Sequence, residues 1–582
     1  MVLLSNQQGM NLNVPSSSEQ KLLKPDKYGL IFEEWRLQQT QGIQWIEDAD
    51  WFEDINKRKA DDVQDFEVKV LEAPTGTGKT GLIIGVANRQ HNLRFLVLCA
   101  TKLEQEQYMK VITSGFDVVS VKGKNNFHCG AVNPGVFLGT ESRECSSNGC
   151  ALTHVDDAPC QGGLKCEFRD ECAYFQQRNR AKNARVVVTS YPMGLRMINM
   201  PNPERQGLGK FDVIVEDEGH VLDQMMESFL GIVISRRVLK RIFNVSLPSK
   251  PEQFSIPYWK TSEYINDLIE DMEKVQFRLD AELEEYSDFA VNGHAPPKEL
   301  VRDALIAGRY ISAFHRIQTL DSKNWLVEDE GKGEDSPIKF TPVWTTTEAR
   351  DILFGKGLGH IIMSGTIPSA KMLAQKTGIE QHEMEFKRLP YTFPIENRRI
   401  KVLPRVDLTW KNIQNNLPRL VTEVDEILSG HRDQKTLIHT VSYRITEFLK
   451  KNSQYSWAFY THNSRNRIQV LNQFKLADPM AVLVSPSFDK AVDLPGDECE
   501  AIIIAKLPWP NVGNPVIKRR MQQNKGWYEY ECLSTLLQMI GRGNRQPSDV
   551  CDIYILDKGA KRFLDRVSGF LNPDLLTSIK YE

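Results

Sequence analysis

Short runs of consecutive apolar residues recur along the chain, separated by longer segments with helical periodicity. They lie at residues 67–73, 94–100, 185–190 and 211–215, and again at 359–363, 436–440, 481–485, 501–505 and 552–556. Strands without polar alternation are buried on both faces, which is typical of a parallel sheet covered by helices. The pattern therefore predicts an α/β protein with two parallel-sheet domains.

Two segments interrupt this pattern. Residues 125–185 are rich in Gly, Asn, Pro and Cys and end in a predicted helix at 174–184, so we interpret them as an inserted domain. Residues 238–340 have apolar side chains at helical spacing among many carboxylates, most clearly between Tyr264 and Leu283. We expect this second insertion to be mostly helical, with its carboxylates on a solvated face.

A chain of 582 residues is too long for one hydrophobic core. The predicted organisation is a flexible leader at 1–27, a first α/β domain in three parts at 28–124, 186–237 and 341–378, the insertions at 125–185 and 238–340, and a second α/β domain at 379–582. The leader is predicted from its high content of Asn, Gln, Ser and Lys.

Composition narrows the class of protein. Hydrophobic residues make up 41% of the chain and charged residues 26%, as in soluble globular proteins. The sequence has no long apolar run and no signal peptide, so we expect a cytoplasmic protein without a membrane span. The net charge of -3 neither indicates nor excludes nucleic-acid binding, because the sum can hide a local basic groove.

A phosphate-binding loop follows the first predicted strand, where residues 73–80 have the sequence APTGTGKT. Glycines let backbone N–H groups approach phosphate, the lysine can reach the β and γ phosphates, and the last threonine can ligate Mg²⁺. The residues predicted to contact ATP here are Thr75, Gly76, Thr77, Gly78, Lys79 and Thr80. The strand before the loop and the helix after it give the motif its expected context.

Two further motifs fit a nucleotide site. Asp217 and Glu218 follow an apolar strand, so one carboxylate can hold Mg²⁺ while its neighbour polarises the attacking water. Near the C-terminus, Arg542 and Arg545 are three residues apart and would share one face of a helix. Guanidinium groups from a second domain can stabilise charge on the γ-phosphoryl group, so hydrolysis would require the domains to close.

Six of the ten cysteines lie between the phosphate loop and this acidic pair. They are Cys129, Cys145, Cys150, Cys160, Cys166 and Cys172. Clustered cysteines in a reducing compartment are more often metal ligands than disulfides. The residues alone leave an iron–sulfur cluster, a structural zinc site and free buried thiols as alternatives, and His154 could join Cys145 and Cys150 at zinc.

The order of these motifs resembles that of the DinG/XPD family of superfamily 2 iron–sulfur DNA helicases, over about residues 28–565. Residues 36–39 are similar to the R-x-x-Q segment that contacts adenine, and 73–80 to motif I. The D-E-G-H sequence at 217–220 resembles a DEAH box with glycine for alanine. S-G-T at 364–366 resembles the family's S-A-T segment, and Q-M-I-G-R-G-N-R at 538–545 resembles motif VI.

One motif departs from the family pattern. Residues 487–496 resemble the segment S-F-W-E-G-V-D-x-P-G, but Asp489, Lys490 and Ala491 replace Trp, Glu and Gly. This loop, with Asp493 as a candidate nucleotide contact, couples nucleic acid to nucleotide in the family. The three substitutions put that coupling in doubt here.

The resemblance implies two RecA-like motor domains, with an Fe–S insertion and an arch-like helical insertion in the first. It implies ATP, Mg²⁺ and a 4Fe–4S cluster as ligands. The implied site residues are Arg36, Gln39 and Asp493 for nucleotide, Thr80 and Asp217 for magnesium, Glu218, Gln538, Arg542 and Arg545 for catalysis, and Cys129, Cys160, Cys166 and Cys172 for the cluster.

The implied activity is 5′ to 3′ movement on single-stranded DNA and unwinding of forked or tailed duplex DNA. We expect a monomeric motor, with an accessory protein as an option, serving repair or replication. A basic run at 178–185 is a candidate contact to the DNA backbone. Two alternatives stay open: an ATP-driven DNA-binding clamp that does not separate strands, and an RNA helicase with a structural zinc domain.

Overall fold

The computed structural model describes residues 24–582 with gaps. The gaps are residues 48, 64, 114–115, 134, 137–141, 143, 145–153, 248–254, 288–294, 330–335, 392, 464, 488–493 and 545–547. Most of the predicted leader therefore lies outside the described residues, as do Cys145, Cys150, Asp493 and Arg545. None of the helices in the described ranges is long and apolar enough to cross a membrane.

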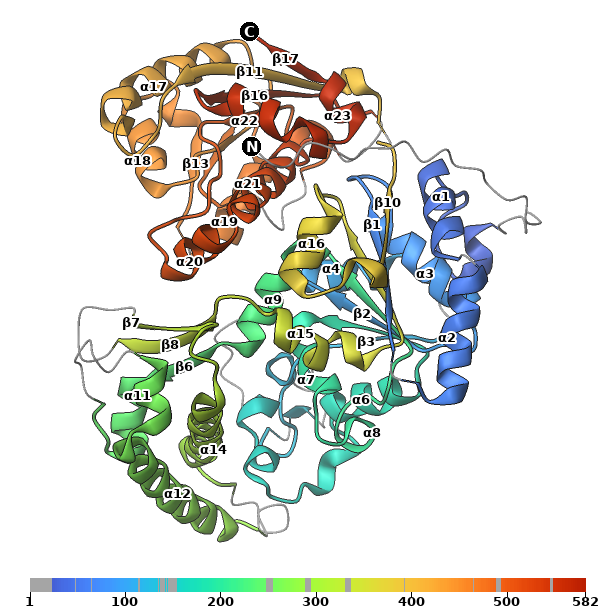
Figure 1. The fold of residues 1–582 in the computed structure, drawn as a ribbon, viewed down its shortest axis with the longest axis vertical. Coiled ribbons are helices and arrows are strands. Elements are labelled where there is room, and N and C mark those ends of the chain that lie inside the picture. Colours follow the sequence, from blue (N-terminus) through green and yellow to red (C-terminus); the bar gives the residue numbers. More distant parts are fainter. Residues whose placement is uncertain are drawn as a thin grey trace.

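The first sheet is parallel throughout, with strand order β10-β1-β9-β5-β2-β4-β3 (Figure 1). Its strands are β1 (Glu67–Glu72), β2 (Phe95–Cys99), β3 (Val118–Val121), β4 (Val186–Ser190), β5 (Val213–Asp217), β9 (Gly359–Ser364) and β10 (Met384–Arg388). Helices α1 (Leu37–Ile46), α2 (Ala49–Asp61), α3 (Lys79–Arg89), α4 (Lys102–Lys110), α7 (Tyr191–Ile198), α9 (Leu222–Leu230), α15 (Thr346–Ile352) and α16 (Ala370–Thr377) surround it.

The second sheet is also parallel, with order β13-β14-β12-β15-β16-β11-β17. Its strands are β11 (Arg398–Val406), β12 (Thr436–His439), β13 (Phe459–Thr461), β14 (Val482–Ser485), β15 (Ala501–Ile504), β16 (Cys551–Asp557) and β17 (Ile579–Tyr581). Its helices are α17 (Ile413–Ser429), α18 (Tyr443–Asn452), α19 (Arg467–Leu476), α20 (Pro515–Gln523), α21 (Lys525–Ile540), α22 (Ala560–Val567) and α23 (Pro573–Thr577).

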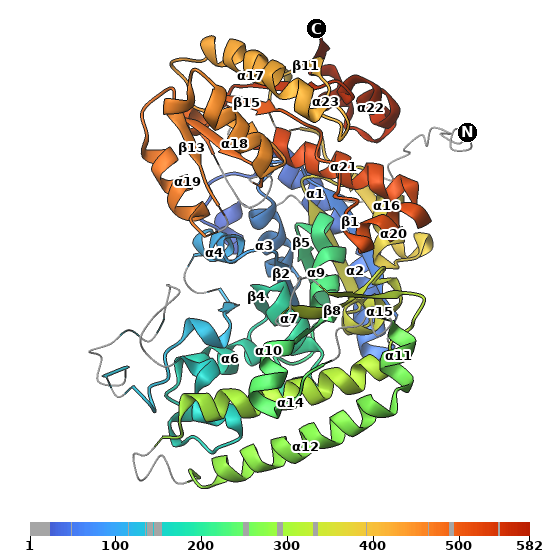
Figure 2. The same ribbon diagram turned by 90° about the vertical axis from the view of Figure 1, so that its left-hand side faces the viewer.

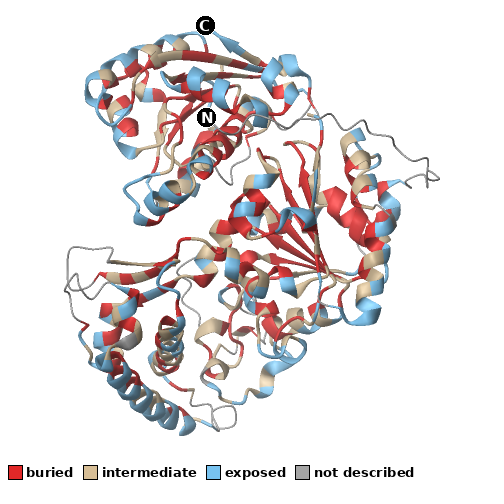
Figure 3. Ribbon diagram, in the orientation of Figure 1, coloured by how far each residue is buried: buried red, intermediate tan, exposed pale blue. Residues whose placement is uncertain are grey.

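These two sheets confirm the predicted fold class of two RecA-like domains, hereafter the first and second motors. Buried residues concentrate in both sheets and in the helix faces that cover them (Figure 3). One expected boundary is wrong, because β10 pairs with β1 in the first sheet. The chain therefore leaves the first motor after Arg388 and not at residue 378.

The second insertion is mostly helical, as the periodicity predicted. It contains α11 (Ile256–Thr261), α12 (Glu263–Glu284) and α14 (Lys298–Thr319), and the two long helices lie side by side (Figure 2). An antiparallel sheet of β6 (Ile232–Ser235), β8 (Pro337–Pro342) and β7 (Trp325–Asp329), in that order, joins it to the first motor. The sequence did not predict this sheet, because β6 has only three consecutive apolar residues and β8 alternates between buried and partly buried positions.

In its described residues, the first insertion consists mainly of short turns and helix α6. Helix α6 (Ala173–Asn183) lies where the sequence predicted a helix, and three short 3-10 helices precede it (Val155–Asp157, Pro159–Gly162 and Glu167–Arg169). Arg302 of α14 forms an ion pair with Asp157 at 3.0 Å, so the two insertions contact each other.

Candidate active site

The phosphate loop joins β1 to α3, and its glycines are required by its conformation. Gly76 and Gly78 have φ angles of 84° and 79°, a left-handed region that disfavours other residues. A Cβ on Gly76 would lie 1.9 Å from Cζ of Phe393, and a Cβ on Gly78 would lie 2.5 Å from Nε2 of Gln39. The loop is therefore closely covered by other parts of the chain.

Two residues that were predicted to contact adenine hold the carbonyls of this loop. The Arg36 guanidinium donates to the carbonyl of Gly76, and Gln39 Nε2 donates to the carbonyl of Gly78 at 3.0 Å. Gln39 Oε1 also accepts from the Arg36 N–H at 2.9 Å. The structure thus brings Arg36 and Gln39 to the phosphate loop, while their contact with adenine stays a prediction.

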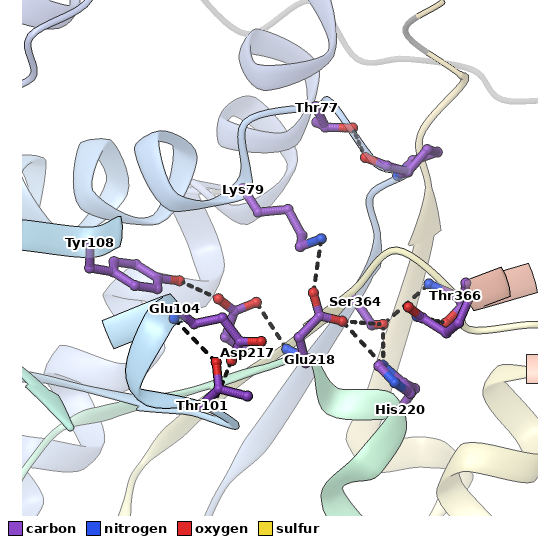
Figure 4. Close-up of polar contacts among 12 residues, drawn as sticks. Thr77, Lys79, Thr101, Glu104, Tyr108, Asp217, Glu218, His220, Ser364 and Thr366 are labelled. Atoms are coloured by element: carbon purple, nitrogen blue, oxygen red, sulfur yellow. Dashed lines mark hydrogen bonds and ion pairs between the residues drawn. The ribbon is translucent and has the colours of Figure 1, made fainter. Parts of the chain in front are cut away.

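The acidic pair lies at the end of β5, opposite the first turn of α3. Lys79 Nζ lies 3.3 Å from Glu218 Oε1, and Asp217 Oδ2 accepts a hydrogen bond from the Tyr108 hydroxyl at 2.9 Å (Figure 4). Glu218 has a φ of 53°, which is unusual for a residue other than glycine. That conformation turns the chain sharply after β5 and points the Glu218 carboxylate at the lysine.

The carboxyl groups around Lys79 differ in charge because their neighbours differ. Burial and the nearby Glu218 raise the pKa of Asp217 to about 6. Burial also acts to raise the pKa of Glu218, but Lys79 and His220 outweigh it and hold that pKa below its ordinary value. The pKa of Glu104 is raised to about 8 by burial and by the charges of Glu218 and Asp217. A cation bound here would favour loss of these protons.

The next part of the site runs from the D-E-G-H box to the S-G-T segment on β9. His220 Nδ1 lies 2.8 Å from Ser364 Oγ and 3.2 Å from Glu218 Oε2. Ser364 Oγ also accepts from the Thr366 N–H at 3.2 Å (Figure 4). The position of Ser364 therefore depends directly on Glu218 and His220.

From the S-G-T segment the contacts cross into the second motor. Gln538 Nε2 on α21 donates to Thr366 Oγ1 at 2.5 Å, and Arg542 donates to Gln538 Oε1 at 3.1 Å. A Cβ on Gly541 would lie 3.3 Å from Thr75 Oγ1, so this segment also approaches the phosphate loop. The structure therefore brings Gln538 and Arg542 to the site, while Arg545 and Asp493 lie outside the described residues.

The glycine in the D-E-G-H box has a packing reason. A Cβ on Gly219 would lie 2.2 Å from Cγ2 of Ile362, a buried residue of β9. An alanine would therefore require movement of a central strand.

The four cysteines predicted to be ligands line a single small cavity. Cys129, Cys160, Cys166 and Cys172 share it with apolar side chains that include Phe175. Burial raises the pKa of Cys129 to about 12 and also raises those of Cys160 and Cys166, so all three thiols are protonated without a metal.

The cavity offers four sulfur donors, which suit either an iron–sulfur cluster or a structural zinc ion with four cysteine ligands. As placed, the described His, Cys, Asp and Glu side chains form no group of three or more close enough to hold a metal. A cluster would therefore have to draw the four thiolates inward. His154 stacks on His128 with ring centroids 5.3 Å apart and is not among the cavity's lining residues.

Comparisons with known proteins agree with this geometry. The family described as "Type III restriction enzyme, res subunit" matches residues 34–244, and the "Helicase C-terminal domain" family matches residues 426–568. The chain is 21% identical to the ATP-dependent DNA helicase YoaA of Haemophilus influenzae, over 85% of this chain and 88% of that protein. It is 22% identical to the ATP-dependent DNA helicase DinG of Photobacterium profundum, over 44% of this chain and 39% of that protein.

Among solved structures, an XPD helicase matches with a TM-score of 0.57 and 16% identity, covering 92% of this chain and 99% of that one. This likeness concerns the fold. Together with the motif order and the two relatives, it indicates a family. The chain is similar to the DinG/XPD-like superfamily 2 helicases.

Some residues of this helicase's site were not found from the sequence. Glu104 was not recognised as a site residue, because its position three residues after Thr101 also fits an ordinary helix capping box. The structure contains this capping box. Tyr108 lies on the same helix, and its hydroxyl bond to Asp217 could not be inferred without the fold. Phe393 gives no local signal, because it lies in an irregular segment between the motors.

Replacing Glu104 by Gln is expected to flatten the pH dependence of stability in the metal-free helicase. An unfolded glutamate loses its proton at about pH 4.3, whereas folded Glu104 keeps it to about pH 8. The stability contributed by the protonated group is thus present below the unfolded pKa and is lost as the pH rises through the folded pKa. One proton changes the free energy of unfolding by at most about 1.4 kcal/mol per pH unit.

This is measured by urea unfolding with a chelator between about pH 5 and pH 8, the range over which the pKa shift acts. The exposed Glu106→Gln is the matched control and should keep the wild-type slope. Equal slopes for Glu104→Gln and wild type would contradict the prediction.

Proposed function

We propose that this chain is an ATP-dependent DNA helicase that moves 5′ to 3′ on single-stranded DNA and separates duplex strands. The observation that carries the proposal is the polar connection from Lys79 through Glu218, Ser364 and Gln538 to Arg542, which spans both motors. Such a connection lets the state of the nucleotide depend on the relative position of the motors. The named activity of the relatives supports DNA as the nucleic acid.

In the proposed hydrolysis step, Lys79 and Thr80 hold the phosphates and magnesium, and Asp217 holds the metal. Glu218 orients and polarises the attacking water, because Lys79 and His220 hold its pKa below the ordinary value and keep it ionised. Closure of the second motor supplies Gln538 and Arg542, with Arg545, to the γ-phosphoryl group. Release of the cleaved phosphate then removes the negative charge that these residues bind, so the motors can separate and step.

A cationic region between the insertions supports a path for the DNA backbone. A cavity of about 770 Å³ lies among α12, α14 and β6 and includes Arg309 and Gln161 in its lining. Burial lowers the pKa of Lys124, and the nearby Arg196, Arg178 and Arg309 lower it further. A phosphodiester would relieve this repulsion among cations.

We also propose that Cys129, Cys160, Cys166 and Cys172 hold a 4Fe–4S cluster. When bound, the cluster would supply covalent cross-links among separate chain segments that have few apolar contacts of their own. The insertion would then be rigid enough to act as a wedge at the point where strands separate. Action as a monomer, a cytoplasmic location, and a part in repair or replication remain predictions.

Lys79→Ala is expected to lower DNA-stimulated ATP hydrolysis by at least about 100-fold, because the ammonium is predicted to hold the transferring phosphate. Phosphate release with single-stranded DNA measures this. The exposed Lys110→Ala on α4 is the charge-matched control and should retain turnover. Wild-type turnover in Lys79→Ala would contradict the motor assignment.

Strand separation distinguishes the helicase from the alternatives. We expect ATP-dependent unwinding of duplex DNA with a 5′ tail and little unwinding with a 3′ tail, measured by release of a labelled strand. ATP hydrolysis without separation would indicate the DNA-binding clamp. Stimulation by RNA, with zinc in the protein, would indicate the RNA helicase.

Protein purified without oxygen is expected to contain about four irons per chain and to absorb near about 400 nm. Cys166→Ser should lose most of the iron because it removes one of four thiolates. Cys532→Ala, in the second motor, is the control and should keep the iron. Zinc in place of iron would contradict the cluster.

A further inference from the structure

A cluster of charged side chains joins the two motors away from the residues predicted to contact ATP. This inter-motor ion cluster consists of Asp223 and Glu227 on α9, Lys376 on α16, Arg520 on α20 and Glu531 on α21. Helices α9 and α16 belong to the first motor, and α20 and α21 to the second. They meet where the motors touch (Figure 2).

Lys376 lies at the centre of the cluster and is fully buried. Its Nζ is 2.8 Å from Asp223 Oδ1 and 3.1 Å from Glu531 Oε1, and it donates to the carbonyl of His220 at 2.8 Å. All three hydrogens of the ammonium can thus be used. One side chain therefore connects the D-E-G-H box and α9 with α21 of the second motor.

Arg520 reaches from the second motor into the first. Its guanidinium donates to Glu227 at 2.7 Å and to the carbonyl of Val343 at 2.5 Å. Its Cζ lies 5.3 Å and 5.5 Å from the ring centroids of Trp344 and Trp527, two rings that contact each other edge to face. A planar guanidinium that packs against aromatic rings and donates hydrogen bonds in fixed directions has few geometries available, so these contacts restrict where Arg520 can lie.

The helices that carry the cluster also carry the active-site motifs. Helix α9 begins immediately after the D-E-G-H box, and α21 ends just before Arg542. On α21, Trp527, Glu531 and Gln538 are spaced i, i+4 and i+11, so they share one face of the helix. A helix is rigid over this length, so docking at Glu531 determines where Gln538 lies.

Stability alone does not account for so many charges at this interface. Well-packed apolar residues usually stabilise a contact as well as buried ion pairs do, because charges lose their hydration. Compared with an apolar interface, a network of ion pairs and hydrogen bonds favours a single arrangement of the helices that carry it. An apolar interface would allow α21 to slide or rotate against α9 and α16.

We propose that Lys376 and Arg520 are positioning residues that set the register of α21 against α9, and thereby place Gln538 and Arg542 opposite Glu218. The proposal deepens the proposed function, because it rests on ATP hydrolysis at this site. Neither residue contacts the phosphate loop, so both act on hydrolysis through α9 and α21.

The central pair of the cluster, Lys376 and Asp223, does not act as a pH switch, although burial raises the pKa of Glu531 and Glu227. The pKa of Lys376 stays above its ordinary value, because Asp223 and Glu531 outweigh the effect of burial. The pKa of Asp223 stays below its ordinary value, because Lys376 and Arg520 outweigh burial in the same way. This central pair remains charged across the neutral range, so changes of pH within that range leave the contact intact.

In the full chain, Arg520→Met is expected to lower kcat for DNA-stimulated ATP hydrolysis at least about tenfold, while the KM for ATP changes less than about threefold. The contacts of Arg36, Gln39 and Lys79 are untouched, so ATP binding should persist. The exposed Arg519→Met, on the same helix and with the same loss of charge, should behave as wild type. Steady-state kinetics and thermal unfolding are measured together.

Glu531→Gln keeps the test decisive if Arg520→Met does not fold, and a double variant tests the shared contact if it does. Glu531→Gln keeps the shape of the side chain but removes one charge from Lys376, and it should lower kcat in the same selective way. Glu227→Gln combined with Arg520→Met should lower kcat no further than Arg520→Met alone, because both act through one contact.

The outcomes separate this proposal from the proposed function. A lower melting temperature with unchanged kcat in Arg520→Met and Glu531→Gln would overturn positioning and leave a structural role. Independent, multiplicative losses in the double variant would also overturn it. Wild-type protein without ATP hydrolysis would overturn the proposed function itself.

Discussion

The arrangement of the active site depends on two adjacent carboxylates held in the interior at the end of β5. Burying such charges is costly unless each has a partner. Glu218 is compensated by Lys79 and His220, whereas Asp217 is bonded by Tyr108 and carries a raised pKa. A magnesium ion would complete this compensation, so nucleotide and metal binding are favoured by the same imbalance of charge.

The charges of Lys79, Asp217 and Glu218 also explain how ATP hydrolysis can be coupled to movement of the two motors. Glu218 lies within 3.4 Å of Ser364, and contacts continue to Gln538 on α21. Any change of charge at the phosphates therefore alters a connection that crosses between the motors. Helix α9 begins next to the D-E-G-H box, and α21 carries Gln538 and ends next to Arg542. The inter-motor ion cluster lies along these two helices.

The two insertions differ in what holds each of them together, and one ion pair connects them. The first has only a small apolar cluster beside the four cysteines and consists mainly of short turns in its described residues, so a bound cluster would add to its rigidity. The second has its own apolar core between α12 and α14. The ion pair of Arg302 with Asp157 links them beside the cationic cavity.

The sequence by itself determined the two parallel sheets, the phosphate loop, the acidic pair and the cysteine array, because these signals are local. Apolar runs define buried strands, and glycines at 76 and 78 require a left-handed backbone. Only the tertiary structure decided that β10 belongs to the first motor, that Phe393 covers the loop, and that Lys376 bonds the carbonyl of His220. These contacts join residues far apart in the chain, so their energies appear only after folding brings the partners together.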